Sequence, residues 1–250
     1  MSTGIELRYR IVDVFSDRPL AGNALCVVLD PCPEPVMQAV AREVNLSETT
    51  FPVVVEDAEY EMRIFTPLGE LPFAGHPSLG TAWVLGARSW TQRTEGATVT
   101  VEATAEGATM SQPDPVLSEL PGGEGWLADA AGNRHVIVAR EHGTLTDAGW
   151  QPFALPAGTT TVSFLRPIDD RTLHVRAFVP GDRPFEDPGT GSLAGPAAVL
   201  ARRLWGTAVD VEIRQGDEVG RPCRIHVHVE PGGLRVGGDV TPCAEGTFTL

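Results

Sequence analysis

Two apolar runs near the start of the chain, "YRIVDVF" and "NALCVVLD", are bounded by turn residues and predict two strands. A turn at residues 17–19 separates them, and Pro31 ends the second run. The next run, "VMQAVAREV", places its apolar residues at helical spacing, which predicts a helix over residues 36–44. Glu48 follows this expected helix closely, in the segment "NLSETTF".

Further along, "TTFPVVV", "YEMRIFTP" and "TVTVEAT" have the composition of strands. The run "GHPSLGTAWVLGAR" predicts a buried helix, with a start signal at Pro77 and Ser78 and an end at Gly86. From about residue 105 to residue 132 the pattern fades into glycine, proline and acidic residues. We place a boundary there, between an N-terminal half of residues 1–115 and a C-terminal half of residues 116–250, with the final strand a candidate to return to the first half.

The second half repeats the first in outline. "RIFTP", which begins at Arg63, recurs as "RAFVP", which begins at Arg176, an offset of 113 residues (176 minus 63). Each copy is followed by a loop rich in glycine and proline and then by a helix of small residues, which predicts a duplicated unit. Two such corners can bring two helix N-termini to one cleft, where free N–H groups suit a carboxylate. The alternative is that two glycine-rich turns merely start two helices.

Composition then limits the partners. The formal charge is −14, the pI is near 4.8 and no basic patch is present, which argues against a nucleic-acid partner. No run approaches the roughly 20 apolar residues of a membrane span, and we expect a cytoplasmic protein with no membrane partner. All 19 basic residues are arginine. Without lysine, neither a Schiff base to pyridoxal phosphate nor a phosphate loop that carries lysine is possible.

Two groups of residues raise the question of a metal. Four cysteines are present without the close spacing of a metal site, and we interpret them as ordinary core or surface thiols. His226 and His228 share one face of an expected strand, but no third ligand is apparent nearby. A plain strand is the preferred interpretation, and no metal is expected. The cysteines are Cys26, Cys32, Cys223 and Cys243.

Three side chains at the corners could carry chemistry: Glu48, His76 in "AGHPSLG", and Asp187 in "EDPGTGS". Each also has a structural explanation. The histidine could bond a nearby carbonyl, the aspartate could cap a turn, and the glutamate could be solvated. Together they are the acid/base groups needed to remove a proton from carbon and return it elsewhere. Desolvation can raise the pKa of a glutamate, and a neighbouring histidine or aspartate can relay the proton.

Backbone and hydroxyl groups near these residues could hold a ligand. Amides at Gly75 and Gly191 would stabilise a carboxylate or a developing negative charge. Ser192 lacks the surroundings of a nucleophile, so we interpret its hydroxyl as ligand-binding, and the hydroxyl of Ser47 lies beside Glu48 in the sequence.

Read in order, these segments resemble the PhzF family of phenazine-biosynthesis-type proteins, which share their fold with diaminopimelate epimerase. The resemblance runs through five ordered motifs and covers nearly the whole chain. These are "VDVFSDRPLAGNALCVV", "NLSETTF", "ELPFAGHPSLGTA", "FEDPGTGSLAGPAA" and "QGDEVGRPCRI". It implies an α+β fold of two pseudo-symmetric halves, each a curved, mostly antiparallel sheet around a central helix, with the site between the halves.

The resemblance also implies a function. In the phenazine-pathway member the glutamate of the "SET" motif moves a proton within trans-2,3-dihydro-3-hydroxyanthranilate, and by position this residue is Glu48. His76 and Asp187 would assist, while Gly75, Gly191, Ser192 and Ser47 would bind the substrate. The expected protein is a cofactor-independent isomerase of a small-molecule carboxylate, often a homodimer. The alternative is a member of this fold that binds a ligand or a protein without turnover.

Overall fold

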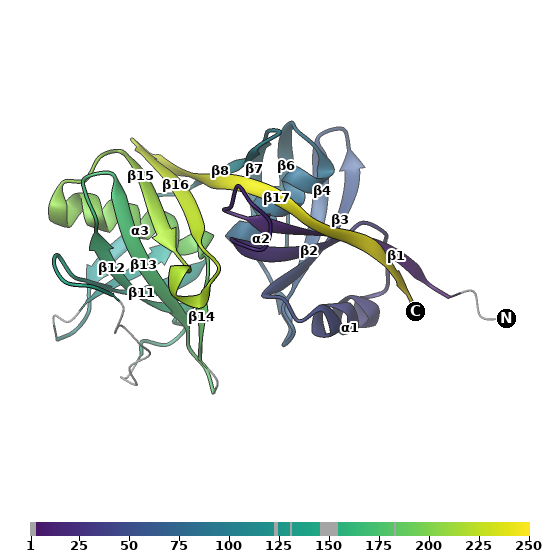
Figure 1. Cartoon of the computed structure of the whole chain (residues 1–250), viewed down its shortest axis with the longest axis horizontal. Helices are drawn as coiled ribbons and strands as arrows, with labels where there is room; N and C mark the ends of the chain where they lie inside the picture. The colour runs from purple at the N-terminus through teal and green to yellow at the C-terminus, as the bar shows by residue number, and fades with distance from the viewer. Residues whose placement is uncertain (1–3, 123–124, 131, 146–154, 183) are drawn as a thin grey trace. The chain divides into compact units, whose positions relative to one another are not determined.

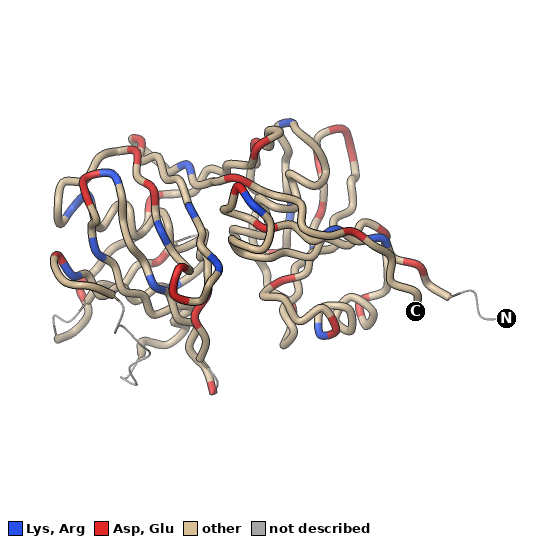
Figure 2. Tube along the Cα trace, viewed as in Figure 1, with Lys and Arg blue, Asp and Glu red and all other residues tan. Residues whose placement is uncertain are grey.

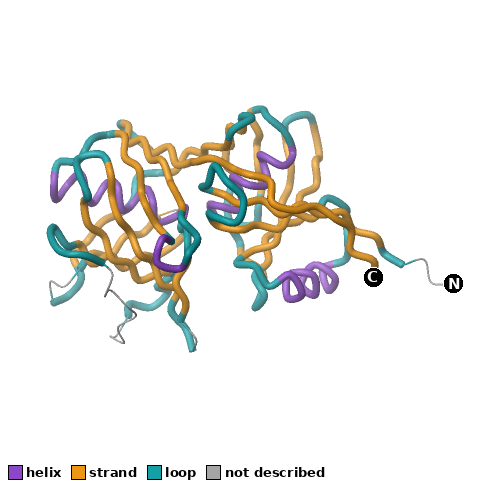
Figure 3. Tube along the Cα trace, in the orientation of Figure 1, coloured by secondary structure: helices purple, strands orange, loops and turns teal. Residues whose placement is uncertain are grey.

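The structure is a computed structural model that describes residues 4–122, 125–130, 132–145, 155–182 and 184–250. Strands are the predominant secondary structure of the described chain (Figure 3). The chain forms two compact units. Unit 1 comprises Met1–Met110 and Gly238–Leu250, and unit 2 comprises Ser111–Gly237. No helix of the described chain is long and apolar enough to cross a membrane.

Unit 1 is a sheet wrapped around one helix (Figure 1). The order of pairing is β1, β2, β3, β4, β6, β7 and β8, with parallel pairs at β2–β3 and β4–β6. β17 pairs with both β1 and β8, so the sheet closes on itself. Its strands are β1 (Glu6–Val14), β2 (Asn23–Val28), β3 (Glu48–Glu56), β4 (Glu59–Phe65), β5 (Glu70–Leu71), β6 (Ser89–Arg93), β7 (Thr98–Ala103), β8 (Gly107–Gln112) and the end of β17 (Gly233–Thr249).

The two helices of unit 1 differ in burial. Nine residues of α2 (Gly75–Leu85) are buried, because the helix packs inside the sheet against β1, β2, β3 and β7. The small residues of this segment allow that close packing. By contrast, α1 (Glu34–Val44) is amphipathic and buries only Val40 and Ala41.

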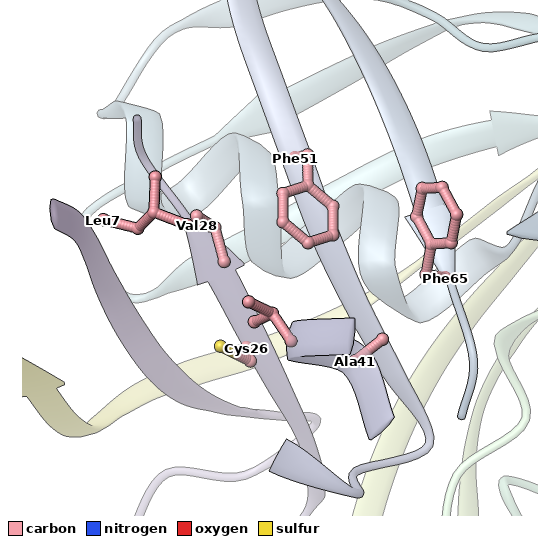
Figure 4. Packing of buried hydrophobic residues seen from close by; sticks show 7 residues of the cluster. Leu7, Cys26, Val28, Ala41, Phe51 and Phe65 are labelled. Carbon is pink, nitrogen blue, oxygen red and sulfur yellow. The ribbon is translucent and has the colours of Figure 1, made fainter. Parts of the chain in front are cut away.

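α1 and the start of β3 share one hydrophobic cluster. Phe51 and Phe65 lie on neighbouring strands with their rings 5.6 Å apart, edge to face, and Ala41 of α1 packs against the same cluster (Figure 4). Burial of such aromatic side chains contributes roughly 1.5–3 kcal/mol each. This cluster therefore holds α1 against the start of β3, whose first residue is Glu48.

Unit 2 repeats this arrangement around α3 (Gly191–Trp205). Its pairing order is β9, β10, β11, β12, β13, β15, β16 and β17, with parallel pairs at β11–β12 and β13–β15. Its elements are β9 (Val116–Glu119), β10 (Trp126–Ala130), β11 (Asn133–Ala139), β12 (Thr161–Pro167), β13 (Thr172–Val179), β14 (Phe185–Asp187), β15 (Asp210–Gln215), the 3-10 helix η1 (Asp217–Val219), β16 (Cys223–Glu230) and the start of β17.

The strand register confirms the duplication. Phe65 faces Thr49 in the β3–β4 pair, and Phe178 faces Val162 in the β12–β13 pair, each partner displaced by the offset of 113 residues seen in the sequence. The α+β fold of two pseudo-symmetric halves around central helices is thus confirmed.

Two details differ from the sequence pattern. The segment in which the pattern faded contains three short strands, β8, β9 and β10, which have only six, four and five residues and therefore show little alternation. α2 begins at Gly75, before the start signal at Pro77, and Ala74 at its N-cap position provides no side-chain cap. Hydrogen bonds from other elements hold this helix start in place, as described next.

Candidate active site

Glu48 is the first residue of β3, and its side chain is 16% exposed. α1 ends at Asn45, which adopts a left-handed conformation (φ 53°) and reverses the chain toward the sheet. Glu48 then pairs with Leu25 of β2. Two residues on, Oγ1 of Thr50 lies 2.8 Å from Oγ1 of Thr81 on α2, so β3 is fixed against the helix that carries His76.

His76, the second residue of α2, lies beside Glu48. Its Nε2 is 3.5 Å from Oε2 of Glu48, and its Nδ1 is 3.4 Å from Nδ2 of Asn23. Burial lowers the pKa of His76 to about 3, although a hydrogen bond with the backbone of Ala24 raises it in part. The ring is therefore neutral near pH 7, and its contact with Glu48 is a polar contact and not a salt bridge.

Gly75 and His76 open α2, so their N–H groups belong to the first turn, which has no partners within the helix. A chain of buried side chains anchors this turn. The hydroxyl of Tyr60 donates to Oε1 of Gln92 (2.7 Å), Nε2 of Gln92 donates to Oγ of Ser78 (2.9 Å), and Oγ of Ser78 donates to the Ala74 carbonyl (2.8 Å). A rigid, uncapped helix N-terminus can bind a carboxylate. Ser47 is half-buried in the bend before Glu48.

In unit 2, Asp187 ends β14 and lies at the corner that leads into α3. Oγ1 of Thr190 donates to Oδ2 of Asp187 (2.5 Å), and Nε2 of Gln215 donates to the Asp187 backbone carbonyl (2.7 Å) and to Oγ1 of Thr190 (3.0 Å). The N–H of Gly189 also reaches Oδ1 of Asp187 at 3.4 Å. Asp187 therefore accepts hydrogen bonds from residues of its own turn. The same bonds fix the orientation of its carboxylate.

Gly191 and Ser192 are the first two residues of α3, the positions that Gly75 and His76 occupy in α2. Thr190 at the N-cap position makes no side-chain cap bond to the helix. Nε2 of Gln112 donates to the Gly191 carbonyl (3.1 Å), and Ser192 is 9% exposed. The second half therefore presents a second uncapped helix start.

Sequence reasoning missed several buried polar residues in these corners. Asn23 is 1% exposed and contacts His76, and His135 on β11 is fully buried with Nδ1 2.8 Å from Oγ1 of Thr161. Burial lowers the pKa of His135 to about 4, while the backbone of Ser192 raises it in part. The only signal in the sequence was a polar residue just before an apolar run, as in "NALCVV" and "HVIV".

The residues that raised the question of a metal lie elsewhere. His226 is exposed and His228 half-buried on β16, where Nδ1 of His228 lies 2.5 Å from Oδ1 of Asp210 on the neighbouring strand. All four cysteines are free thiols. Within the described ranges, no group of three or more His, Cys, Asp or Glu side chains could hold a metal ion.

A duplicated α+β unit of this kind is an epimerase-like fold. The solved structure of a predicted epimerase from Pseudomonas aeruginosa aligns with 98% of this chain and 99% of its own, with a TM-score of 0.76 and 27% identity. A phenazine biosynthesis protein of the PhzF family from Enterococcus faecalis has the same fold, with a TM-score of 0.80, 24% identity and coverage of 98% and 100%.

The sequence comparisons define the family. Residues 12–121 match the family model described as phenazine biosynthesis-like protein. Trans-2,3-dihydro-3-hydroxyanthranilate isomerase of Pseudomonas aeruginosa is 35% identical to this chain, and the alignment covers 92% of each protein. The chain belongs to the phenazine biosynthesis-like (PhzF) family, and the predicted enzyme class, an isomerase, is confirmed.

Proposed function

We propose that the protein moves a proton, and with it a double bond, within trans-2,3-dihydro-3-hydroxyanthranilate or a closely related cyclic carboxylate. The observation that carries this proposal is the pair in unit 1: a half-buried carboxylate, Glu48, 3.5 Å from a neutral histidine, His76. The name of the Pseudomonas aeruginosa relative supplies the substrate.

Glu48 acts first as a base and then as an acid. Its carboxylate accepts a proton from a ring carbon, the electron pair left behind shifts the double bond, and the same carboxyl group returns the proton to another carbon. The reaction is balanced without an oxidant or reductant. The neutral ring of His76 assists, because it can donate a hydrogen bond to the carboxylate or pass a proton on.

The remaining proposed residues bind and orient the substrate. The free N–H groups at Gly75 and Gly191, with the hydroxyls of Ser47 and Ser192, are assigned to the substrate carboxylate and to the negative charge that develops during transfer. Asp187 is assigned to proton transfer, and its hydrogen bond from Thr190 supports an oriented carboxyl group.

These groups suffice for proton transfer, so we propose that the reaction needs no metal or organic cofactor. We also propose that the enzyme is a homodimer and that it acts in the cytoplasm.

The free cysteines fit a reducing compartment. The proposed partner is a small carboxylate and not nucleic acid. Acidic and basic residues are interspersed along the trace with an excess of acid, which does not favour a phosphate backbone (Figure 2). Analytical ultracentrifugation measures the assembly state.

The decisive experiment follows trans-2,3-dihydro-3-hydroxyanthranilate by NMR in deuterated water. Wild-type protein should rearrange it and incorporate deuterium, and Glu48→Gln should lose about 10²–10⁴-fold in rate, the usual contribution of an acid/base group. Glu43→Gln, on the exposed face of α1, is the matched control and should keep the wild-type rate. Full activity in Glu48→Gln would refute the assignment of the base, while binding without proton exchange in the wild type would indicate a ligand-binding protein.

A further inference from the structure

Asn23 is a buried polar residue for which the proposed reaction has no role. It begins β2, is 1% exposed, and directs its side-chain amide toward Nδ1 of His76 at 3.4 Å. Its place in the fold is tightly determined. Gly22 before it has φ 68°, and a Cβ there would lie 2.5 Å from the Val14 carbonyl oxygen, so the turn requires glycine.

The turn before Asn23 is also tied to β1. Oδ2 of the buried Asp13 accepts a hydrogen bond from the Leu20 N–H at 2.7 Å, and Asn23 pairs with Val14 across the β1–β2 ladder. The amide of Asn23 is therefore presented to His76 from a constrained backbone and not from a mobile loop.

A neutral imidazole carries one N–H, and the partner of one nitrogen determines which nitrogen bears it. With Nδ2 of Asn23 opposite Nδ1, as the structure places it, the amide donates, Nδ1 accepts and the proton sits on Nε2. Nε2 is the atom that lies 3.5 Å from Oε2 of Glu48. An N–H there attracts the ionised carboxylate, whereas a bare nitrogen would place its lone pair against the carboxylate oxygen.

We infer that Asn23 is a positioning residue that keeps the proton of His76 on Nε2, facing Glu48. The inference rests on the proposed function of the Glu48–His76 pair. Its consequence is that Glu48 is ready to accept a proton from substrate, with a hydrogen-bond donor 3.5 Å away. The 3.5 Å separation would shorten in the substrate complex, as catalytic hydrogen bonds commonly do.

The competing arrangement involves the neighbouring residue. The backbone of Ala24 forms a hydrogen bond that raises the pKa of His76. If the Ala24 carbonyl accepts from Nδ1–H, the Asn23 amide is turned to present its oxygen, and bare Nε2 faces Glu48. The two arrangements predict opposite tautomers, and NMR of the ring nitrogens distinguishes them directly.

The test uses the whole protein with ¹⁵N-labelled histidine rings, and a His76→Gln sample assigns the signals in a long-range ¹H–¹⁵N correlation spectrum. We expect the wild type to show protonated Nε2 and unprotonated Nδ1. Asn23→Asp replaces the donor by an acceptor of the same shape, and it should move the proton to Nδ1 and lower kcat at least about tenfold, since a wrong tautomer disables a catalytic histidine. KM should change less than kcat. Asn133→Asp, at the equivalent start of β11 in unit 2, is the matched control and should leave the His76 signals unchanged.

The outcomes separate this inference from the proposed function. A protonated Nδ1 in the wild type overturns the role of Asn23, whatever the activity of the protein. This measurement is made on the wild type alone and does not depend on the folding of a variant. An unchanged tautomer in Asn23→Asp overturns it as well. The expected tautomers together with no isomerase activity in the wild type would support the positioning by Asn23 and reject the proposed reaction.

Discussion

Arg176 holds Glu186 with two parallel hydrogen bonds, Nε to Oε1 at 2.9 Å and Nη2 to Oε2 at 2.6 Å, in the hairpin just before Asp187. Arg63 and Glu70 make the same paired contact in unit 1, at 2.7 and 2.6 Å. Each guanidinium also lies over the ring of the phenylalanine two residues on, Phe178 or Phe65, at 5.3 and 5.1 Å. The duplicated unit thus braces the strand before each helix start in the same way.

Burial distinguishes the two ion pairs and leads to the first prediction. The side chains of Arg176 and Glu186 are 11% and 8% exposed, against 37% and 31% for Arg63 and Glu70. Glu186→Gln should lower the free energy of unfolding by about 3–5 kcal/mol, because it removes the main counter-charge of a buried guanidinium. Glu70→Gln should cost only about 0–1 kcal/mol, since solvent screens an exposed pair. Urea unfolding of both variants measures the difference, and equal losses would contradict the role of burial.

The two buried histidines predict how stability depends on pH. The pKa of His76 is lowered from 6.5 to about 3, and that of His135 from 6.5 to about 4. Below about pH 6.5 the unfolded chain therefore binds protons at these two histidines that the folded chain does not bind. The free energy of unfolding should therefore be highest above about pH 6.5 and fall by roughly 1.4 kcal/mol per pH unit for each histidine as the pH drops toward about 4.

Urea midpoints between about pH 7.5 and about pH 5 provide this measurement. His135→Gln should show a shallower loss than the wild type. His142→Gln is the control, because the side chain of His142 is 88% exposed, and it should follow the wild-type curve. A steep loss that persists in His135→Gln would assign the acid sensitivity to other groups.

The hydroxyl of Thr190 is expected to orient Asp187. Thr190→Val removes the donor to Oδ2 of Asp187, and we expect kcat to fall by about 10–100-fold, by analogy with the loss of hydrogen-bond partners that orient metal ligands. The fold should persist, since Gln215 still donates to the Asp187 backbone. In Thr207→Val, the control, the lost hydroxyl is buried and makes no hydrogen bond among the described residues, so activity should be unchanged. Equal activities of the two variants would show that Asp187 needs no orientation.

Gly80 sets the distance between α2 and the sheet. A Cβ at this position would lie 2.7 Å from Cδ2 of Leu25 and 2.8 Å from Cγ2 of Val14, both on buried strands. Gly80→Ala should reduce the free energy of unfolding by about 1 kcal/mol, because overpacking of about 1–3 kcal/mol exceeds the gain of up to about 1 kcal/mol in helix propensity. Gly69→Ala, where nothing lies within 4 Å of the added atom, should stay within about 0.5 kcal/mol of the wild type in thermal unfolding. An unchanged stability of Gly80→Ala would mean that α2 can shift freely.

Local patterns predicted the elements that have strong periodicity. α1, β1, β3 and β4 lie where the apolar spacing indicated, and the repeat of "RIFTP" as "RAFVP" corresponds to β4 and β13. β8, β9 and β10 were not apparent, because strands of only four to six residues contain too few alternations to show the period of two.

The sequence by itself determined the duplication and the presence of Glu48, His76 and Asp187 at the corners of the two units, since these depend on short runs of neighbouring residues. Only the tertiary structure decided that His76 is neutral, that Asn23 and Glu48 face its two ring nitrogens, and that His135 is buried. The pKa and the hydrogen-bond partners of a side chain depend on burial and on contacts between distant segments, and packing alone creates both.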